Sequence, residues 1–275
     1  SRAGCRNRHS HLVEETGLMK FKGTAAMMVA FFSIGIYYFL IDLPAEEKKA
    51  QEKEIAGKIL PLTITNISEF SLIKKDQTIT LQQNANNIWN LSHPLEAVGD
   101  NPEAESFLSE IEALENSRVV ESYPKNLSKY GLDAPSFKIH IKFKEGKEET
   151  LLFGDDSPMG GKIYLKLKSN PAVLLATTSK TTFNKSIYQF RDKTIFNFST
   201  GSITQIQIIR NEHPLDLVRE KEEWKISGKV QATADKDAVL AFLQIIQFSR
   251  VKEFVNEKPD SLEAFGLKKP TATLI

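Results

Sequence analysis

The sequence predicts an α+β protein in which one N-terminal transmembrane helix precedes two tandem repeats, each a mostly antiparallel sheet with flanking helices. Three observations predict this: a charge-free apolar run near the N-terminus, a ten-residue phrase that occurs twice, and short stretches of alternating apolar residues between polar turns. The 275 residues are 41% hydrophobic and 26% charged, which is typical of a folded globular chain with about two domains.

The apolar run extends from Gly23 to Ile41 without a charged residue, close to the ~20 residues that cross a bilayer as a helix. A cleaved signal peptide has a shorter apolar region, about 7 to 15 residues, and a small-residue cleavage site, and no convincing site follows here. Tyr37 and Tyr38 suit the membrane interface at the far end of the run. We expect residues 23–41 to be an uncleaved transmembrane helix in the inner (cytoplasmic) membrane.

The flanks of this run set the expected orientation. Residues 1–18 are interpreted as a non-native leader because Met19 resembles a natural start, which leaves residues 19–22 as a short cytoplasmic tail. Lysines lie on both sides of the run, so their count does not decide the orientation. A short tail before a long remainder favours an inside N-terminus with the bulk of the chain outside the cytoplasm. Charges at helical spacing predict a helical stalk over residues 42–63.

The repeated phrase reads "NLSKYGLDAP" at residues 126–135 and "SLEAFGLKKP" at residues 261–270, an offset of 135 positions that the two tryptophans share. Self-similarity at a fixed offset indicates duplicated structural units. We expect the units at residues 64–199 and 200–275. The second stops at a strand that corresponds to the middle of the first, without the partner strand of "TATLI", so we expect it to be a truncated copy.

The phrase itself predicts helix ends. Gly131 and Gly266 follow short helical segments at positions where a left-handed residue is needed, which glycine adopts freely. Leu127 and Leu132 have the spacing of the apolar contact that accompanies a Schellman cap. Polar positions differ between the copies, as where Lys129 is replaced by alanine in the second. The phrase is therefore assigned to the fold and not to catalysis.

The pattern predicts an antiparallel meander, a helix and the capped phrase in both units, followed in the first unit by a hairpin. In the first unit, Asp100 and Glu103 have the spacing of a capping box at the start of an amphipathic helix. Glu145-Gly146 predicts a hairpin turn between alternating strands. Residues 178–190 predict a closing helix.

Composition and motifs give no enzymatic chemistry. The chain has 36 Lys plus Arg against 35 Asp plus Glu, so its net charge of +1 supplies no electrostatic reason to expect nucleic acid. It contains no Gly-x-Ser-x-Gly, no phosphate-binding glycine loop with lysine and no His-Glu-x-x-His. The single cysteine lies in the leader, and the histidines lack metal-ligand spacing. We expect no catalytic residue, no cofactor and no metal, and hence a non-enzyme.

The segment "GDDSPMGGKIY" is the candidate interaction loop. Asp155, Asp156 and Ser157 are oxygen ligands of the kind that bind cations, and Gly160 and Gly161 would let the backbone of a partner approach. Acidic, glycine-rich turns are also ordinary hairpin chemistry. The sequence is compatible both with an interaction site and with an ordinary hairpin turn.

The anchor, the tryptophan strands, "YGLDAP", "KEETLLFGDDSPMGGKIYLKLKSNPAVLLATTS" and "FRDKTIFNF" together resemble the bacterial domain-of-unknown-function family 4340. The resemblance covers Met19 to Ile275. It implies single-pass membrane proteins that are often encoded beside ABC-type transporter components of the gliding-motility type, with no established activity and no catalytic residues to transfer.

The predicted function is that of a non-enzymatic accessory or scaffold protein of an envelope ABC-type transport system. Its expected partners are the membrane, through residues 23–41, and an ABC transporter permease or associated envelope protein. One alternative is an extracytoplasmic module that binds glycan or peptide through an exposed sheet surface. A second is a hydrolase that uses the "GDDS" loop, which would require a cleft joining that loop to a base.

Overall fold

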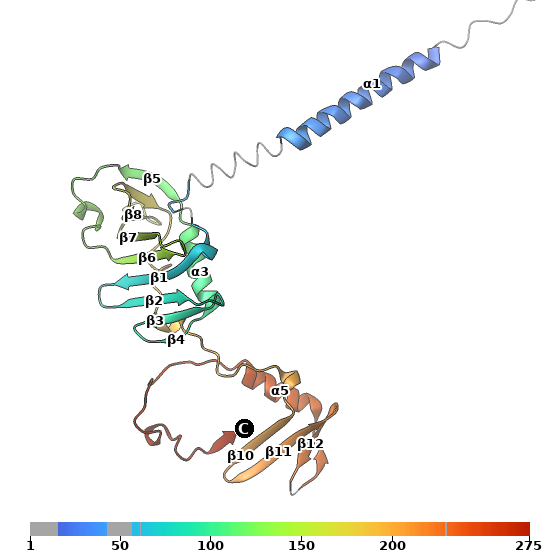
Figure 1. Ribbon diagram of the computed structural model, residues 1–275, viewed down its shortest axis with the longest axis vertical. Helices are drawn as coiled ribbons and strands as arrows, with labels where there is room; N and C mark the ends of the chain where they lie inside the picture. Colours follow the sequence, from blue (N-terminus) through green and yellow to red (C-terminus); the bar gives the residue numbers. More distant parts are fainter. Residues whose placement is uncertain (1–15, 43–56, 61, 229) are drawn as a thin grey trace, which may run out of the picture. The chain divides into compact units, whose positions relative to one another are not determined.

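The computed structural model describes residues 16–42, 57–60, 62–228 and 230–275, and the chain divides into two units at Pro61/Leu62 (Figure 1). The first unit contains helix α1 (Thr16–Tyr37), which continues as the π-helical turn η1 (Tyr38–Asp42). Within those ranges, no helix combines the length and the apolar character needed to cross a membrane. The span at residues 23–41 stays a prediction, and most of the predicted leader and stalk lies outside the described residues.

The second unit begins with a nine-stranded sheet in the order β4-β3-β2-β1-β6-β7-β8-β9-β5, in which every neighbouring pair is antiparallel. Its strands are β1 Ile67–Lys74, β2 Thr78–Gln83, β3 Trp89–His93, β4 Ala97–Val98, β5 Asn116–Glu121, β6 Phe137–Phe143, β7 Glu148–Asp156, β8 Ile163–Leu167 and β9 Val173–Ala176. The predicted fold class, α+β with a mostly antiparallel sheet, is confirmed.

The core of this sheet follows from its alternating pattern. Strand β6 buries Phe137, Ile139 and Ile141 and leaves the residues between them partly exposed, because successive side chains point to opposite faces. Helix α3 (Asn101–Glu112) begins where the Asp100 carboxylate accepts the Glu103 N–H at 3.2 Å. Figure 1 shows α3 alongside β1 and β2. An aromatic cluster joins them, formed by Phe70, Trp89, Phe107, Phe183 and Phe190.

A second, five-stranded antiparallel sheet follows in the order β13-β12-β11-β10-β14. Its strands are β10 Gln205–Arg210, β11 His213–Glu220, β12 Glu223–Ser227, β13 Ala232–Thr233 and β14 Ala272–Leu274. Helix α5 (Lys236–Gln247) is capped by the Asp235 carboxylate and lies beside the sheet in Figure 1. The small core comprises Ile206, Leu217, Trp224, Val239 and Leu243.

The second sheet reproduces part of the first. The order β4-β3-β2-β1-β6 corresponds to β13-β12-β11-β10-β14, and each short strand before the helix leads into a 12-residue helix. The pair Leu72–Ile139 corresponds in register to Ile208–Leu274. Strand β14 thus has β10 as a partner along one edge, which corrects the expectation that the strand in "TATLI" is unpaired.

Two predicted helices are shorter than expected. The closing helix at residues 178–190 is only α4 (Ile187–Phe190), preceded by turns in which Thr182 N–H donates to Ser179 O and Asn184 N–H to Thr181 O. Serine, threonine and asparagine are weak helix formers because their side chains hydrogen-bond locally, which explains the difference. The segment before Gly131 is a single 3-10 turn, η3 (Ser128–Tyr130).

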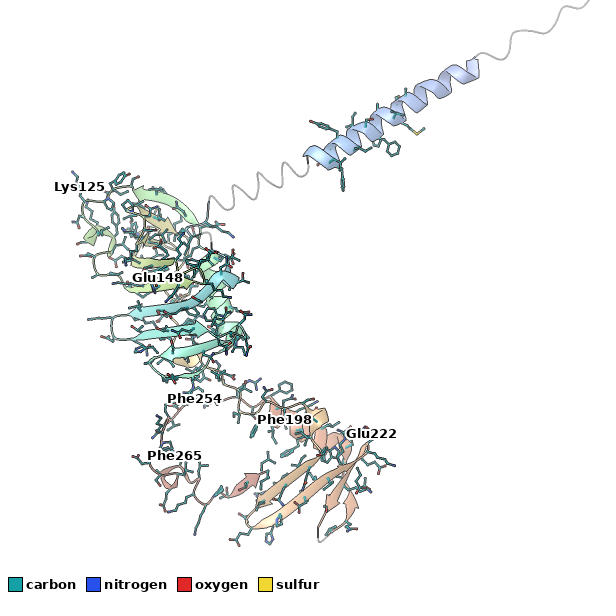
Figure 2. The ribbon with its side chains drawn as sticks, viewed as in Figure 1. Lys125, Glu148, Phe198, Glu222, Phe254 and Phe265 are labelled. Atoms are coloured by element: carbon teal, nitrogen blue, oxygen red, sulfur yellow. The ribbon has the colours of Figure 1, made fainter. Side chains whose placement is uncertain are left out.

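The segment that follows α4 runs between elements of both sheets. The Asp192 N–H donates to Val98 O at 2.9 Å, and the Val251 N–H donates to Lys193 O at 2.8 Å. Beside them Arg191 donates to both carboxylate oxygens of Glu257, which holds the pKa of that carboxyl below its usual value. The Arg191 guanidinium also lies 3.5 Å from the ring centroid of Phe254, a residue labelled in Figure 2.

Candidate functional site

The candidate interaction loop is the turn between β7 and β8. Its ends are joined because Ser157 N–H donates to Lys162 O at 2.8 Å, and Gly160 N–H donates back to Ser157 O at 3.0 Å. Gly160 and Gly161 have φ of 70° and 62°, in the left-handed region that glycine enters without strain. Turn geometry therefore accounts for both glycines, and the space around their α-carbons is open.

The polar residues of the loop are divided between surface and interior. The side chains of Asp155 and Asp156 are each 65% exposed, and Lys180 Nζ lies 3.9 Å and 3.7 Å from one oxygen of each. Ser157 is buried, and its hydroxyl accepts the Met159 N–H at 3.4 Å. In the part of the chain that the structure describes, no three His, Cys, Asp or Glu residues gather as metal ligands.

The two glycines of the repeated phrase have Schellman geometry. Gly131 has φ of 63°, its N–H donates to Ser128 O at 3.2 Å, and Leu132 N–H donates to Leu127 O at 3.1 Å. The second copy repeats this with Gly266 at φ of 69° and a 3.0 Å bond from Leu267 N–H to Leu262 O.

The first cap packs directly on the end of β7. A Cβ placed on Gly154 would lie 2.1 Å from Tyr130 O, and one placed on Gly131 would lie 2.5 Å from the carboxylate carbon of Asp155. Leu132 is consequently 3% exposed, whereas Leu267 in the second copy is 58% exposed. The repeated phrase and the candidate loop, separate in the sequence, form one packed unit.

Tyr130 is the polar member of that unit. Its hydroxyl donates to a Glu121 carboxylate oxygen at 2.8 Å, and its ring centroid lies 5.0 Å from that of Tyr164. The hydrogen bond to Glu121 is the main reason that the pKa of Tyr130 is raised, because a phenolate could not donate it.

A cavity of about 400 Å³ opens next to this unit, at the end of the first sheet. Three segments line it: the β1–β2 turn, the start of β6 and the loop before α4. The lining residues are Lys74, Lys75, Asp76, Gln77, Ser136, Phe137, Lys180, Thr181 and Asn184. Lys180 belongs both to this cavity and to the contacts with the candidate loop, so we treat cavity and loop as one candidate site.

The electrostatics of the cavity are dominated by lysine. Lys74 Nζ donates to Asn184 Oδ1 at 2.7 Å and to Lys185 O at 2.6 Å, which are both uncharged acceptors. Partial burial lowers the pKa of Lys74 because desolvation disfavours the charged form. Sequence reasoning missed this site, because residues 74–77 ("KKDQ") were not singled out among the polar turns between the alternating strands. Two adjacent lysines in a tight turn were the available signal.

The fold and the site together define the class of this protein, an α+β protein with two related antiparallel sheets and a lysine-lined cavity. The family model described as "Domain of unknown function (DUF4340)" matches residues 89–270, and the chain belongs to this family. Searches of curated proteins and of solved structures found no significant match.

Proposed function

We propose that the protein is a membrane-anchored accessory or scaffold protein of an envelope ABC-type transport system, with its repeats outside the cytoplasm. The observation that carries the anchor is the exposed apolar surface of α1 and η1. Met27, Phe31 and Phe39 are 76%, 76% and 70% exposed, within a described stretch of side chains, residues 26–40, that is exposed throughout. Transfer of such surface from water to lipid is favourable by about 25 cal/mol per Å².

The repeats support a role in holding partners. The phrase that looked most like a motif is a helix cap, and the glycine-rich loop is a hairpin with exposed acids. The ABC-type partner follows from the family resemblance and is part of the proposal.

Location is tested by labelling. The chain has one cysteine, Cys5, so a variant with Cys5→Ser and Lys125→Cys carries a single thiol on an exposed residue of the first repeat. We expect this thiol to react with a membrane-impermeant maleimide in cells with a permeabilised outer envelope. We also expect the protein to sediment with membranes after alkaline washing. A thiol that reacts only after the inner membrane is lysed would refute the proposed orientation.

Partnership is tested by crosslinking the full chain in native membranes, followed by affinity purification and mass spectrometry. The matched control replaces residues 23–41 by an unrelated membrane anchor. We expect an ABC permease or ATPase to be enriched with both proteins, because the repeats would make the contact. If neither protein enriches a transporter subunit, the accessory function is wrong.

A second candidate, peptide binding, is favoured by apolar side chains on the surface of the second repeat. Leu262, Phe265 and Leu267 are 50%, 43% and 58% exposed in the cap before β14, and Figure 2 labels Phe265. Exposed apolar side chains that lie together are typical of sites that bind another polypeptide.

The first repeat suggests the probe for this candidate. There β6 pairs with β1 and also with β7, whose sequence is "EETLLFGDD". We expect a fluorescent peptide of this sequence to bind the full chain. Phe265→Asp should weaken it, and Lys125→Asp should not. Equal binding by both variants would remove the support for a peptide site.

A further inference from the structure

We infer that the lysine-lined cavity at the end of the first sheet is an anion-binding site that takes a phosphate-ester group. This goes beyond the proposed function, which requires contacts with other proteins but no small ligand. The residues that line this cavity belong neither to the repeated phrase nor to the candidate loop, although Lys180 contacts both acids of that loop.

The charge of the lining is the first support. The lining contains Lys74, Lys75 and Lys180 and one acidic residue, Asp76, a formal charge of +2; Asp155 and Asp156, which contact Lys180, lie outside the lining. The whole chain carries +1 over 275 residues, so the excess is local and not a consequence of a basic protein. A concave site with one sign of charge concentrates counter-ions of the opposite sign.

Lys74 is the second support. Among residues 62–228 and 230–275, no carboxylate lies within ion-pair distance of its ammonium group, which donates only to neutral oxygens. A partly buried ammonium without a negative partner bears a desolvation cost, which is why its pKa is lowered. A bound anion beside Lys74 would offset that cost, and this gives the cavity a physical reason to take one.

Lys180 is the third support. Its distances of 3.7 and 3.9 Å to two exposed carboxylates exceed the 2.7–2.9 Å of a tight charge-assisted hydrogen bond. Exposed ion pairs of this kind are weak, because water screens both charges. Lys180 therefore lines the cavity while making only weak contacts with these carboxylates, so its ammonium group can turn toward a ligand.

The chemistry of the lining selects the ligand class. A phosphate monoester carries about −1.5 to −2 charges at neutral pH, which matches the +2 of the lining better than the single charge of a carboxylate. The Thr181 hydroxyl and the Gln77 amide can donate to phosphate oxygens, and the Ser136 hydroxyl, which donates to Gly154 O at 3.3 Å, can accept from a hydroxyl of an attached glycerol or sugar. A volume of about 400 Å³ lies within the range of small-molecule sites.

The test is direct titration of the full chain in detergent, followed by ³¹P NMR and calorimetry at constant ionic strength. The probes are glycerol 3-phosphate, a free monoester, and dihexanoylphosphatidic acid below its micelle concentration, a soluble lipid with the same monoester headgroup. We expect saturable binding of at least one probe. Preference for the first indicates a soluble metabolite, and preference for the second a lipid, and either supports the site.

The decisive comparison uses variants of equal charge. Lys75→Gln with Lys180→Gln should weaken binding at least tenfold, whereas Lys125→Gln with Lys129→Gln, outside the cavity, should leave it unchanged. Lys74→Gln is a third variant, read only if its melting temperature matches the wild type, because its hydrogen bonds also hold the loop before α4. Absence of binding of both probes, or equal weakening by both double variants, would overturn the inference. Partner capture by crosslinking is unaffected by either result.

Discussion

Replacement of Gly154 by alanine tests whether the first Schellman cap packs on β7 as the structure shows. The added Cβ would lie 2.1 Å from Tyr130 O and 3.0 Å from Leu132 Cγ, whereas ordinary contacts begin near 3.4 Å. The closest atom belongs to the backbone, so a side-chain rotation does not relieve the contact. The cap has to move away from the strand by more than 1 Å.

The magnitude follows from what this movement exposes. Insertion of a methyl group into a packed site costs about 1 to 3 kcal/mol, and partial exposure of the buried Leu132 adds part of the ~1.5 to 3 kcal/mol that its burial contributes. We expect a loss of about 3 kcal/mol in the free energy of unfolding of the first repeat. Gly160→Ala is the control, because its φ is positive but its Cβ meets open space, and it should cost about 1 kcal/mol.

Urea unfolding followed by tryptophan fluorescence measures both variants. A Trp224→Phe background leaves Trp89, in the first repeat, as the only reporter. If Gly154→Ala loses no more stability than Gly160→Ala, the close contact between the cap and β7 does not exist in solution, and the account of the site as one packed unit is refuted.

Three further outcomes follow from the same structure. Phe107→Ala, in the aromatic cluster, should cost about 3 to 5 kcal/mol in the urea titration read through Trp89. Phe242→Ala, at the equivalent and less buried position, should cost less when a Trp89→Phe background leaves Trp224 as the reporter. The pKa of Tyr130 is raised in the folded state, so the unfolded chain loses this proton first as pH rises. Stability of the folded state should therefore fall as pH rises above about 10. Melting curves at pH 8 to 11 should show a smaller alkaline loss of stability in Tyr130→Phe. The pKa of Glu257 is lowered in the folded state, so its ion pair with Arg191 stabilises the fold above about pH 4.3, and this contribution is lost as pH falls through the folded pKa. Glu257→Gln should therefore speed hydrogen exchange of the Val251 amide at pH 7. Unchanged exchange would contradict the role of that pair.

The sequence predicted those features that depend only on residues close together in the chain. The left-handed glycine and the leucine spacing predict a cap from a few neighbouring residues, and Gly131 has the dihedrals and hydrogen bonds of that cap. Alternation predicted the antiparallel strands because side chains of a strand point to opposite faces whatever the strand packs against. The helix predicted at residues 178–190 is confined to Ile187–Phe190, because the serine and threonine residues before it favour turns.

The sequence by itself therefore determined the fold class of the repeats, their duplication and the places where chain direction changes, since each depends on residues close together or on a fixed offset. Only the tertiary structure decided that the first cap lies on β7, that β14 pairs with β10, and that Lys74 and Lys180 line one cavity. Those facts depend on which strands become neighbours. Strand order and register are set by burial summed over the whole sheet, which no short stretch of sequence encodes.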